Sequence, residues 1–577
     1  MKLSTKIRLL AHIARWRLTW NRRNTHYEFE VPGNPKFMSP REAVRLIPDA
    51  SVIATSGLGA NQWANILYWA MREVYEETGH PRDLTCVSIG GHGGRGIAPG
   101  SVEEMGQAGL VTRFFTGHTE TFKSMLRLAD QGRLDLQCIP QGQLAFLIDA
   151  QGRGENSVLT TTGVGTLVDP RGGRGTPVVD PDGEQWVSVE DGRLRFRLPE
   201  ITVALFNAPA ADREGNIYVK NCAMIAESRE IARAAKRHGG LVIVNVGLVV
   251  DKGYDDVFLP ADQVDAVVVY PNTDQVGSVR HRKHWSMFTT ESDVSMEEGV
   301  ARLKFANQVL GITPRRTEVD NVLARLAATI FAENVAKGSL VNIGVGLPEE
   351  ACRLIVEAGL FDDITLFTES GVIGGLPAPG VFFGAGVCPK KIISSAQTFK
   401  LCYERLDVSI LGVLQADSEG NVNVSKRGEG AINYVGPGGF MDFTMAAQTV
   451  IFISSWMLNG RFAVEGERLR SIEHGKIKFV DRVDEVTFNG KQALATGKKI
   501  FYVTTVGAFQ LTAGGMELVR LMPGIDLEKD VLNVSPMRII LPESGEVALV
   551  APAIVSGRGF KLALGGASSG RAEVHDV

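Results

Sequence analysis

A nine-residue pattern occurs twice in this chain and restricts the possible folds more than any other feature. The segments ADREGNIYV (211–219) and ADSEGNVNV (416–424) share the form A-D-x-E-G-N-[IV]-x-V, and each follows a β-rich run. A Gly-Asn turn between extended segments would explain one copy alone. Two copies in matching contexts indicate two domains of the same fold. The length of 577 residues agrees, since single cores stop growing at about 250–300 residues.

Apolar runs and amphipathic segments alternate along the chain. Strand-like runs without polar alternation occur at 51–57, 84–90, 240–247, 339–346, 364–370 and 407–415. Such runs are typical of strands buried on both faces, as in parallel sheets covered by helices. Helical patterns lie between them, for example at 62–79, 224–239 and 322–338. We therefore predict an α/β protein with two tandem open α/β domains, related by duplication.

The domain boundaries are predicted from the polar, strand-free stretch at 280–299 and the segment that follows it up to GITPRR. This stretch separates the two copies of the repeated pattern. We predict a basic N-terminal extension at 1–40, a first domain at 41–285, a linker at 286–320 and a second domain at 321–577.

Composition argues against several classes of function. The net charge is −4 and no basic patch with interleaved aromatic residues appears, so we expect no nucleic-acid partner. Six cysteines without CxxC spacing indicate buried thiols in a reducing compartment, without disulfides or a zinc site. His281 and His284 lie among cationic residues in RHRKH, so we interpret them as a surface basic cluster and expect no metal. The longest apolar run, at 241–250, is too short to span a membrane.

The N-terminal 27 residues are basic and contain no acid. Four apolar residues recur there at helical spacing: Leu9, Ile13, Trp16 and Trp20. This predicts an apolar stripe on a basic helix. The stripe would pack on its own subunit or a neighbour, or lie on a membrane surface. We expect packing, in a cytoplasmic homo-oligomer, and keep peripheral membrane contact through residues 1–27 as the alternative.

Nucleotide-binding and serine-hydrolase motifs are weak or missing from the sequence. GGHGGRG (90–96) contains G-x-G-x-x-G at Gly91, Gly93 and Gly96, but Pro99 and Gly100 follow where a dinucleotide site needs a helix. A glycine loop over an active site is the better interpretation. GxxxxGK[ST] does not occur, and ATSGLGA (54–60) does not supply the G-x-S-x-G of serine hydrolases, so we expect neither a P-loop nor a serine nucleophile.

A single carboxylate follows one of the strand-like runs. In LFTESGVIGGLPAPG (366–380), β-forming residues lead to Glu369, and glycines stand at 371, 374 and 375. Alone, such a glutamate is most often a solvated loop residue. However, ligands of open α/β sheets bind beyond the carboxyl ends of the strands, where this residue lies. Glycines beside it would let a bulky substrate approach without a clash, which makes Glu369 a catalytic candidate.

A second glycine cluster, GPGGF (436–440), follows the extended segment INYV. It can turn successive backbone N–H groups, such as those of Gly438 and Gly439, toward one point. Such a nest holds an oxyanion or an anionic group. A simple strand-to-helix turn would use the same residues, and the pattern alone leaves both interpretations open.

Together these motifs resemble the class I coenzyme A transferases, and most closely the fused single-chain acetate/propionate type. The resemblance rests on E-S-G-x-x-G-G (369–375), G-x-G-G-F (436–440), V-N-[IL]-G-[IV]-G (341–346), IPQGQLA (139–145) and GVGTLVDPRGG (163–173). These occur in family order and span about residues 41–530. GGHGGRG differs from the family loop, which has the form G-D-G-x-G, so the acyl group stays open.

The resemblance implies a ping-pong transfer of CoA between carboxylic acids, with a site between the domains and CoA as substrate rather than resident cofactor. It makes Glu369 the nucleophile and places Gln141 near the reacting carboxyl, with Gly438 and Gly439 as oxyanion donors. CoA-binding positions carried over from the family are Asn342, Gly344, Gly346 and Asn423 along the pantetheine, and Gly57, Gly59 and Asn61 on the opposite wall.

Two alternatives to transfer between short-chain acids remain at this stage. Water could resolve the glutamyl thioester, which would make the protein an acyl-CoA hydrolase. A non-catalytic acyl-CoA-binding or membrane-docked scaffold would suit the basic N-terminal helix.

Overall fold

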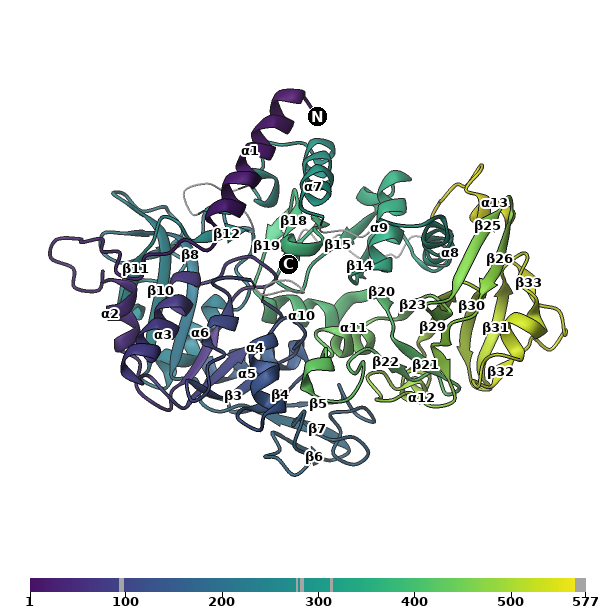
Figure 1. The fold of residues 1–577 in the computed structure, drawn as a ribbon, viewed down its shortest axis with the longest axis horizontal. Coiled ribbons are helices and arrows are strands. Elements are labelled where there is room, and N and C mark those ends of the chain that lie inside the picture. Colours follow the sequence, from purple (N-terminus) through teal and green to yellow (C-terminus); the bar gives the residue numbers. More distant parts are fainter. Residues whose placement is uncertain (93–97, 277–278, 281–284, 312–314, 566–577) are drawn as a thin grey trace.

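The computed structural model describes residues 1–92, 98–276, 279–280, 285–311 and 315–565 (Figure 1). The sequence interpretations of Gly93, Gly96, His281 and His284 concern residues outside these ranges. Within them, no helix is long and apolar enough to cross a membrane, and no three His, Cys, Asp or Glu side chains are grouped as a metal site.

The first half of the chain forms a sheet of eight strands among the described residues, in the order β11-β10-β8-β1-β2-β3-β4, with β9 paired to β8. All pairs along this path are parallel. The strands are β1 (Val52–Thr55), β2 (Leu84–Ser88), β3 (Val111–Thr116), β4 (Asp135–Cys138), β8 (Val203–Asp212), β9 (Ile217–Tyr218), β10 (Leu241–Val250) and β11 (Ala266–Val269). The helices are α2 (Pro40–Arg45), α3 (Asn65–Thr78), α4 (Lys123–Asp130), α5 (Gln141–Gly152) and α6 (Ser228–Arg237).

The second half forms a sheet of nine described strands in the order β15-β14-β20-β23-β29-β30-β31-β32, with β33 paired to β31. Pairing is parallel from β15 to β29, and β30 and β31 continue it as antiparallel strands. The strands are β14 (Ser339–Ile343), β15 (Ile364–Leu366), β20 (Leu406–Gly412), β23 (Thr449–Ile453), β29 (Lys499–Thr504), β30 (Gly507–Thr512), β31 (Gly515–Leu521), β32 (Ile539–Ile540) and β33 (Ala548–Leu549). The helices are α8 (Glu318–Asn334), α9 (Leu347–Glu357), α10 (Ser395–Arg405), α11 (Phe440–Ala446), α12 (Gly490–Ala495) and α13 (Pro552–Ser556).

Smaller sheets decorate both halves. Their strands are β5 (Ser157–Thr160), β6 (Val187–Glu190) and β7 (Arg193–Arg197); β12 (Asp274–Val276) and β13 (Val279–Arg280); β16 (Val372–Ile373) and β19 (Lys391–Ile392); β17 (Leu376–Pro377) and β18 (Gly386–Val387); β21 (Gln415–Asp417), β22 (Val422–Asn423) and β28 (Phe479–Val480); β24 (Met457–Leu458) and β27 (Lys476–Ile477); β25 (Arg461–Glu465) and β26 (Arg468–Glu473).

The central part of the first sheet recurs in the second. Strands β11-β10-β8-β1-β2 correspond in order and direction to β29-β23-β20-β14-β15. The repeated sequence pattern occupies the same turn in both halves: Asp212 N donates to Asn216 O at 3.0 Å, and Asp417 N donates to Asn421 O at 3.1 Å. The predicted α/β class with two parallel-sheet domains is therefore correct. The positions of the domain boundaries remain predictions.

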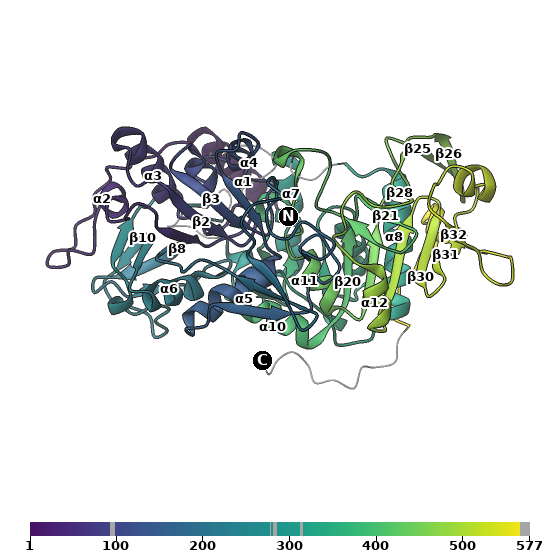
Figure 2. The ribbon, with the colours of Figure 1, turned by 90° about the horizontal axis from the view of Figure 1, so that it is seen from below.

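The two halves meet through helices. Helix α5 of the first half contacts α10 and α11 of the second, and Figure 2 shows α5 beside α10 below the sheets. Apolar side chains of both sheets and of these helices belong to one continuous buried cluster. Residues near this junction are therefore held rigidly relative to each other.

Two helices lie outside the sheets. Helix α1 (Leu3–Thr19) packs beside α7 (Met296–Leu310), which belongs to the predicted linker (Figure 1). Ile13 is buried there, and the rings of His12 and Trp285 meet at 5.9 Å. The predicted apolar stripe of the N-terminal helix thus packs on the protein's own chain.

Candidate active site

Glu369 lies in a tight turn just beyond the carboxyl end of β15. Thr368 N donates to Val372 O at 2.9 Å, and Gly371 N donates to Thr368 O at 3.0 Å. The hydroxyls of Thr368 and Ser370 both donate to the carbonyl of Gly384. Gly371 has φ +103°, and a Cβ atom there would lie 1.7 Å from Ile393 O, so only glycine fits. The turn therefore fixes the backbone on both sides of the half-buried glutamate.

The surroundings of Glu369 favour its neutral form. The pKa of its carboxyl is raised to about 7, mainly by burial; a hydrogen bond with the Gln141 side chain lowers this pKa, and the negative charge of Asp442 raises it. A carboxyl with a pKa near neutrality is more basic, and so a stronger nucleophile, than an exposed glutamate.

The glycine cluster lies directly against this carboxylate. A Cβ atom on Gly439 would be 3.0 Å from Glu369 Oε2. The N–H of Gly438 donates to Gly117 O at 2.7 Å, whereas no described group accepts a hydrogen bond from the N–H of Gly439. Gly439 also precedes the first residue of α11, where the helix dipole favours negative charge. Of the two predicted oxyanion donors, Gly439 is therefore the stronger candidate.

Gln141 reaches this cluster from the other half of the chain. It is the first residue of α5, and its backbone N–H donates to Gly438 O at 2.9 Å. Asp442 fixes the same end of α5, accepting from Gly142 N at 2.8 Å and Gln143 Nε2 at 2.7 Å. A Cβ atom on Gly142 would lie 2.5 Å from Asp442 Oδ1, so the glycine permits this close approach.

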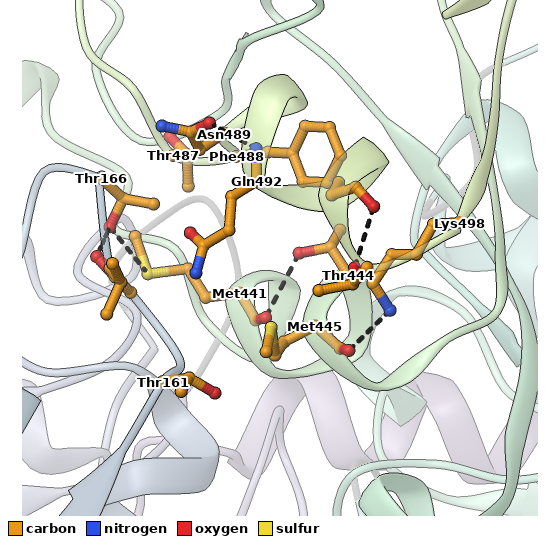
Figure 3. A pocket seen from close by; sticks show the side chains of 14 residues that line it. Thr161, Thr166, Met441, Thr444, Met445, Thr487, Phe488, Asn489, Gln492 and Lys498 are labelled. Atoms are coloured by element: carbon orange, nitrogen blue, oxygen red, sulfur yellow. Dashed lines mark hydrogen bonds between the residues drawn. The ribbon is translucent and has the colours of Figure 1, made fainter. Parts of the chain in front are cut away.

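The far end of α11 is also anchored. Lys498 Nζ donates to Met445 O at 2.7 Å and to Ala447 O at 2.5 Å, and burial lowers the pKa of this lysine to about 8. Figure 3 shows its amine turned toward the end of the helix, beside a cavity of about 30 Å³ that would hold little more than water. A cation at these carbonyls caps the helix, so α11 is fixed at both ends.

A large cavity opens where β14 ends, with a volume of about 650 Å³. Gly344, one of the residues assigned to the pantetheine path by resemblance, lines it together with Val345. A Cβ atom on Gly346 would meet only open space. Asn342 does not line the cavity, and its Oδ1 accepts from Ser409 Oγ at 2.9 Å. The carried-over motif therefore contributes its glycine turn to the cavity, and its asparagine supports the strand.

Helix α7 forms another wall of this cavity. Lys304 and Asn307 of α7 line it together with Arg315, and Asn307 Oδ1 is buried without a hydrogen-bond partner among the described groups. Sequence reasoning missed these residues because they fall in the predicted linker, which carries no motif that points to a ligand.

Asn423 has a different environment from the one predicted. Its amide donates to Gln415 Oε1 and Lys426 O, both at 2.8 Å, and its Oδ1 accepts from Ser425 N at 3.1 Å. The residue is fully buried and does not line the large cavity. Its side chain therefore stabilises its own hairpin.

The first-half loop with Gly57, Gly59 and Asn61 closes against the second half. Asn61 Nδ2 donates to Phe383 O at 2.7 Å. A Cβ atom on Gly59 (φ +60°) would lie 2.4 Å from the same oxygen, and one on Gly57 (φ +123°) would lie 2.7 Å from Asn61 O. Since Phe383 lines the large cavity, this loop supports the cavity wall from outside.

Two further residues at the site carry no family motif. Asp442 is the single acid of α11, and burial raises the pKa of its carboxyl to about 6. His118 packs over the glycine loop, with its Nδ1 4.0 Å from the position of a Cβ atom on Gly438, and burial lowers its pKa. An acid on an otherwise apolar helix after GPGGF was a usable signal for Asp442, whereas nothing in the sequence singled out His118.

Comparison with known proteins identifies the family. The chain is 32% identical to the caffeate CoA-transferase of Acetobacterium woodii over 514 residues, which cover 86% of this chain and 93% of that protein. The chain belongs to the single-chain CoA-transferases of the class I superfamily. It is also 29% identical to the acetate CoA-transferase YdiF of Escherichia coli K12, over 87% of this chain and 92% of that protein. The family and the enzyme class predicted from the motifs are confirmed.

Solved structures agree with this CoA-transferase fold. The acyl-CoA transferase apoenzyme of Escherichia coli O157:H7 aligns with a TM-score of 0.79 at 26% identity, covering 93% of this chain and 99% of that one. A thioester complex of the same bacterial enzyme with CoA aligns equally well, at 27% identity over 91% of this chain and 97% of that one. A family model described as malonate decarboxylase, alpha subunit, transporter matches residues 193–296.

Proposed function

We propose that this acyl-CoA transferase works by a ping-pong reaction in which Glu369 becomes covalently joined to CoA. The observation that carries the proposal is the half-buried carboxylate, with a pKa of about 7, packed against Gly439, whose Cβ position lies 3.0 Å from Glu369 Oε2. The Escherichia coli O157:H7 relative was solved as a thioester complex with CoA, which supports the same type of intermediate here.

The proposed steps balance as follows. The Glu369 carboxylate attacks the acyl-CoA carbonyl, and the resulting oxyanion collapses to an acyl-glutamyl anhydride as CoA leaves as a thiolate. The thiolate then attacks the glutamyl carbonyl, which releases the first acid as its carboxylate and leaves a glutamyl-CoA thioester. A second carboxylate attacks the glutamyl carbonyl of this thioester, which expels the CoA thiolate and forms a second anhydride; the thiolate then attacks the new acyl carbonyl and expels the Glu369 carboxylate. Glu369 is regenerated, and no proton is gained or lost overall.

The raised pKa reduces the chemical difficulty of the first step. An ordinary glutamate (pKa about 4.3) and a thiolate leaving group (about 8.5) differ by about 5–6 kcal/mol if basicity counts fully. With the Glu369 pKa at about 7, the difference falls to about 2 kcal/mol on the same assumption. The N–H of Gly439 would add about 3–4 kcal/mol of transition-state stabilisation as an oxyanion donor. Binding of the remote parts of CoA would supply more.

The large cavity is the proposed binding place for CoA. Gly344 and Val345 offer backbone and a small side chain beside an extended pantetheine. Asn307 Oδ1 would accept from an amide N–H of the pantetheine, which would satisfy this otherwise unpaired buried atom. Lys304 and Arg315 would place positive charge near the phosphates.

The substrates are proposed by analogy, as short-chain acyl-CoA donors and free carboxylic acids. Transfer would need no resident cofactor, since CoA itself is the substrate. Assembly as a homo-oligomer stays an expectation. Peripheral membrane contact through residues 1–27 cannot use the predicted stripe around Ile13, because that face packs beside α7.

The intermediate provides the test. The enzyme is incubated with acetyl-CoA alone, digested and examined by mass spectrometry. We expect the peptide with Glu369 to carry CoA, and hydroxylamine to convert it to a hydroxamate. An unmodified peptide in an enzyme that still transfers CoA would refute the mechanism. Release of CoA that does not depend on added acetate would instead indicate hydrolysis.

A further inference from the structure

The outward side of α1 carries a second row of apolar side chains. Leu3, Ile7, Leu10 and Leu18 are 73%, 57%, 43% and 80% exposed, and we call these four residues the outer row. Their spacing of four, three and eight positions places them on one side of a helix with 3.6 residues per turn. Ala14, also exposed, continues the same line. Such a contiguous apolar surface indicates an interaction site, whereas single exposed leucines need no explanation.

This outer row is distinct from the face that holds α1 on the protein. Leu9 and Ile13 point to the other side of the helix, where Ile13 packs in the cluster that contains Trp285 and Leu303. Figure 1 shows α1 at the edge of the molecule beside α7, with the N-terminus at its outer tip. Docking through the outer row therefore requires no rearrangement of the packed face.

Positive charge accompanies the outer row. Five basic side chains in α1 and at its N-cap are exposed: Lys2, Lys6, Arg8, Arg15 and Arg17. At about 100° per residue, Lys6 and Arg17 fall on one flank of the row, and Arg8 and Arg15 fall on the other. No Asp or Glu occurs before Glu28. The long stems of these residues can lie along apolar surface while their charges stay in water.

We propose that α1 docks on an anionic phospholipid surface through the outer row. Aliphatic side chains would enter the boundary between headgroups and acyl chains, and the flanking cations would face the lipid phosphates. A second copy of this chain is a poorer partner, because a symmetric contact between two α1 helices would bring these like charges together. The anionic lipid surface complements both the apolar row and its charge.

Vesicle co-sedimentation of the full-length enzyme tests this. Vesicles of phosphatidylcholine with phosphatidylserine should bind the protein. Vesicles of phosphatidylcholine alone should bind it at least about tenfold more weakly. The affinity should fall as salt is raised, because salt screens the basic flanks.

The decisive variant is Leu3→Ser, Ile7→Ser, Leu10→Ser and Leu18→Ser together. We expect at least about a tenfold loss of binding to the anionic vesicles, with transfer in free solution unchanged. A matched control changes four exposed aliphatic residues outside α1: Val179→Ser, Val189→Ser, Leu458→Ser and Leu549→Ser. It should bind as the original protein does.

Three outcomes would overturn the proposal. The original protein could fail to bind anionic vesicles, or the outer-row variant could bind them normally. Alternatively, the outer-row variant could lose an oligomeric state, measured by light scattering, without changing lipid binding. That last result would make the outer row a contact between subunits.

Discussion

The two halves of this CoA-transferase share a frame but use it differently. Both place a G-x-G turn after equivalent strands, with Gly57 and Gly59 after β1 and Gly344 and Gly346 after β14. The first turn is closed, because Gly59 lies against Phe383 O. The second turn is open and borders the large cavity. Duplication thus supplied two equivalent strand ends, and packing left one of them open.

The two halves also differ in which of two equivalent positions, the end of a strand or the start of a helix, carries an acid and which carries glycine. In the second half the acid, Glu369, follows strand β15, and a glycine precedes helix α11. In the first half glycines follow strand β2, and an acid, Glu227, precedes helix α6. Glu227 is fully buried, and burial raises its pKa well above the usual value. We expect the fully buried Glu227 to be a structural group, and we propose a chemical role only for the half-buried Glu369.

The largest expected effect separates these two acids. Glu369→Gln should lower the transfer rate at least about 1,000-fold, because an amide cannot form the anhydride. Steady-state kinetics and thermal unfolding measure this. Glu227→Gln is the matched control and should keep most of the activity, since burial raises the pKa of Glu227 well above its usual value and an amide resembles the uncharged acid in shape. A large loss in both variants would mean that the two acids do not differ in role.

Blocking the open turn should weaken CoA binding. Val345 is 52% exposed and lines the cavity, so Val345→Trp fills space without disturbing the core. We expect KM for acyl-CoA to rise about ten- to hundredfold with kcat nearly unchanged. Unaltered KM in a folded variant would place CoA elsewhere.

The pH dependence of thioester formation should reflect Glu369. The attacking form is the carboxylate and its pKa is about 7, so the rate should fall about tenfold per pH unit below that value. The stability of the fold should change with pH in the opposite direction to the rate. Because the pKa of Glu369 is raised in the folded protein, its protonation stabilises the fold at low pH, and this stabilisation is lost as the pH rises toward 7. Asp442→Asn removes a negative charge and should move the midpoint to lower pH. A midpoint near 4.5 in the original enzyme would contradict the effect of burial.

The last expected effect is on stability rather than activity, and it concerns the closed turn. Gly59→Ala should destabilise the protein by about 3 kcal/mol, because the left-handed backbone and the contact with Phe383 O both oppose a methyl group. Gly79→Ala has a similar backbone (φ +74°) but open space, and should cost about 1 kcal/mol. Denaturant unfolding compares the two. Equal losses would show that the first turn is not closed as described.

Sequence patterns predicted what depends on local chemistry. The repeated turn indicated the duplication, and the strand end with glycines indicated Glu369. Residues that act across the junction were harder to predict. Asp442 acquires its role because α5 of the other half lies against it, and Asn307 because α7 folds over the cavity. Asn423, in contrast, was predicted at the site because its motif matched the family, but its hydrogen bonds are made within its own hairpin.

Helix α7 lies between the two binding sites that we propose, for lipid on α1 and for CoA in the large cavity. It carries α1 on one side and forms a wall of the large cavity with Asn307 on the other. If the docking of α1 on a lipid surface shifts α7 even slightly, the affinity of the enzyme for acyl-CoA must change. Thermodynamic reciprocity then requires acyl-CoA to change the affinity for lipid by the same factor. The amount of enzyme on a bilayer would thereby depend on the supply of thioester in solution.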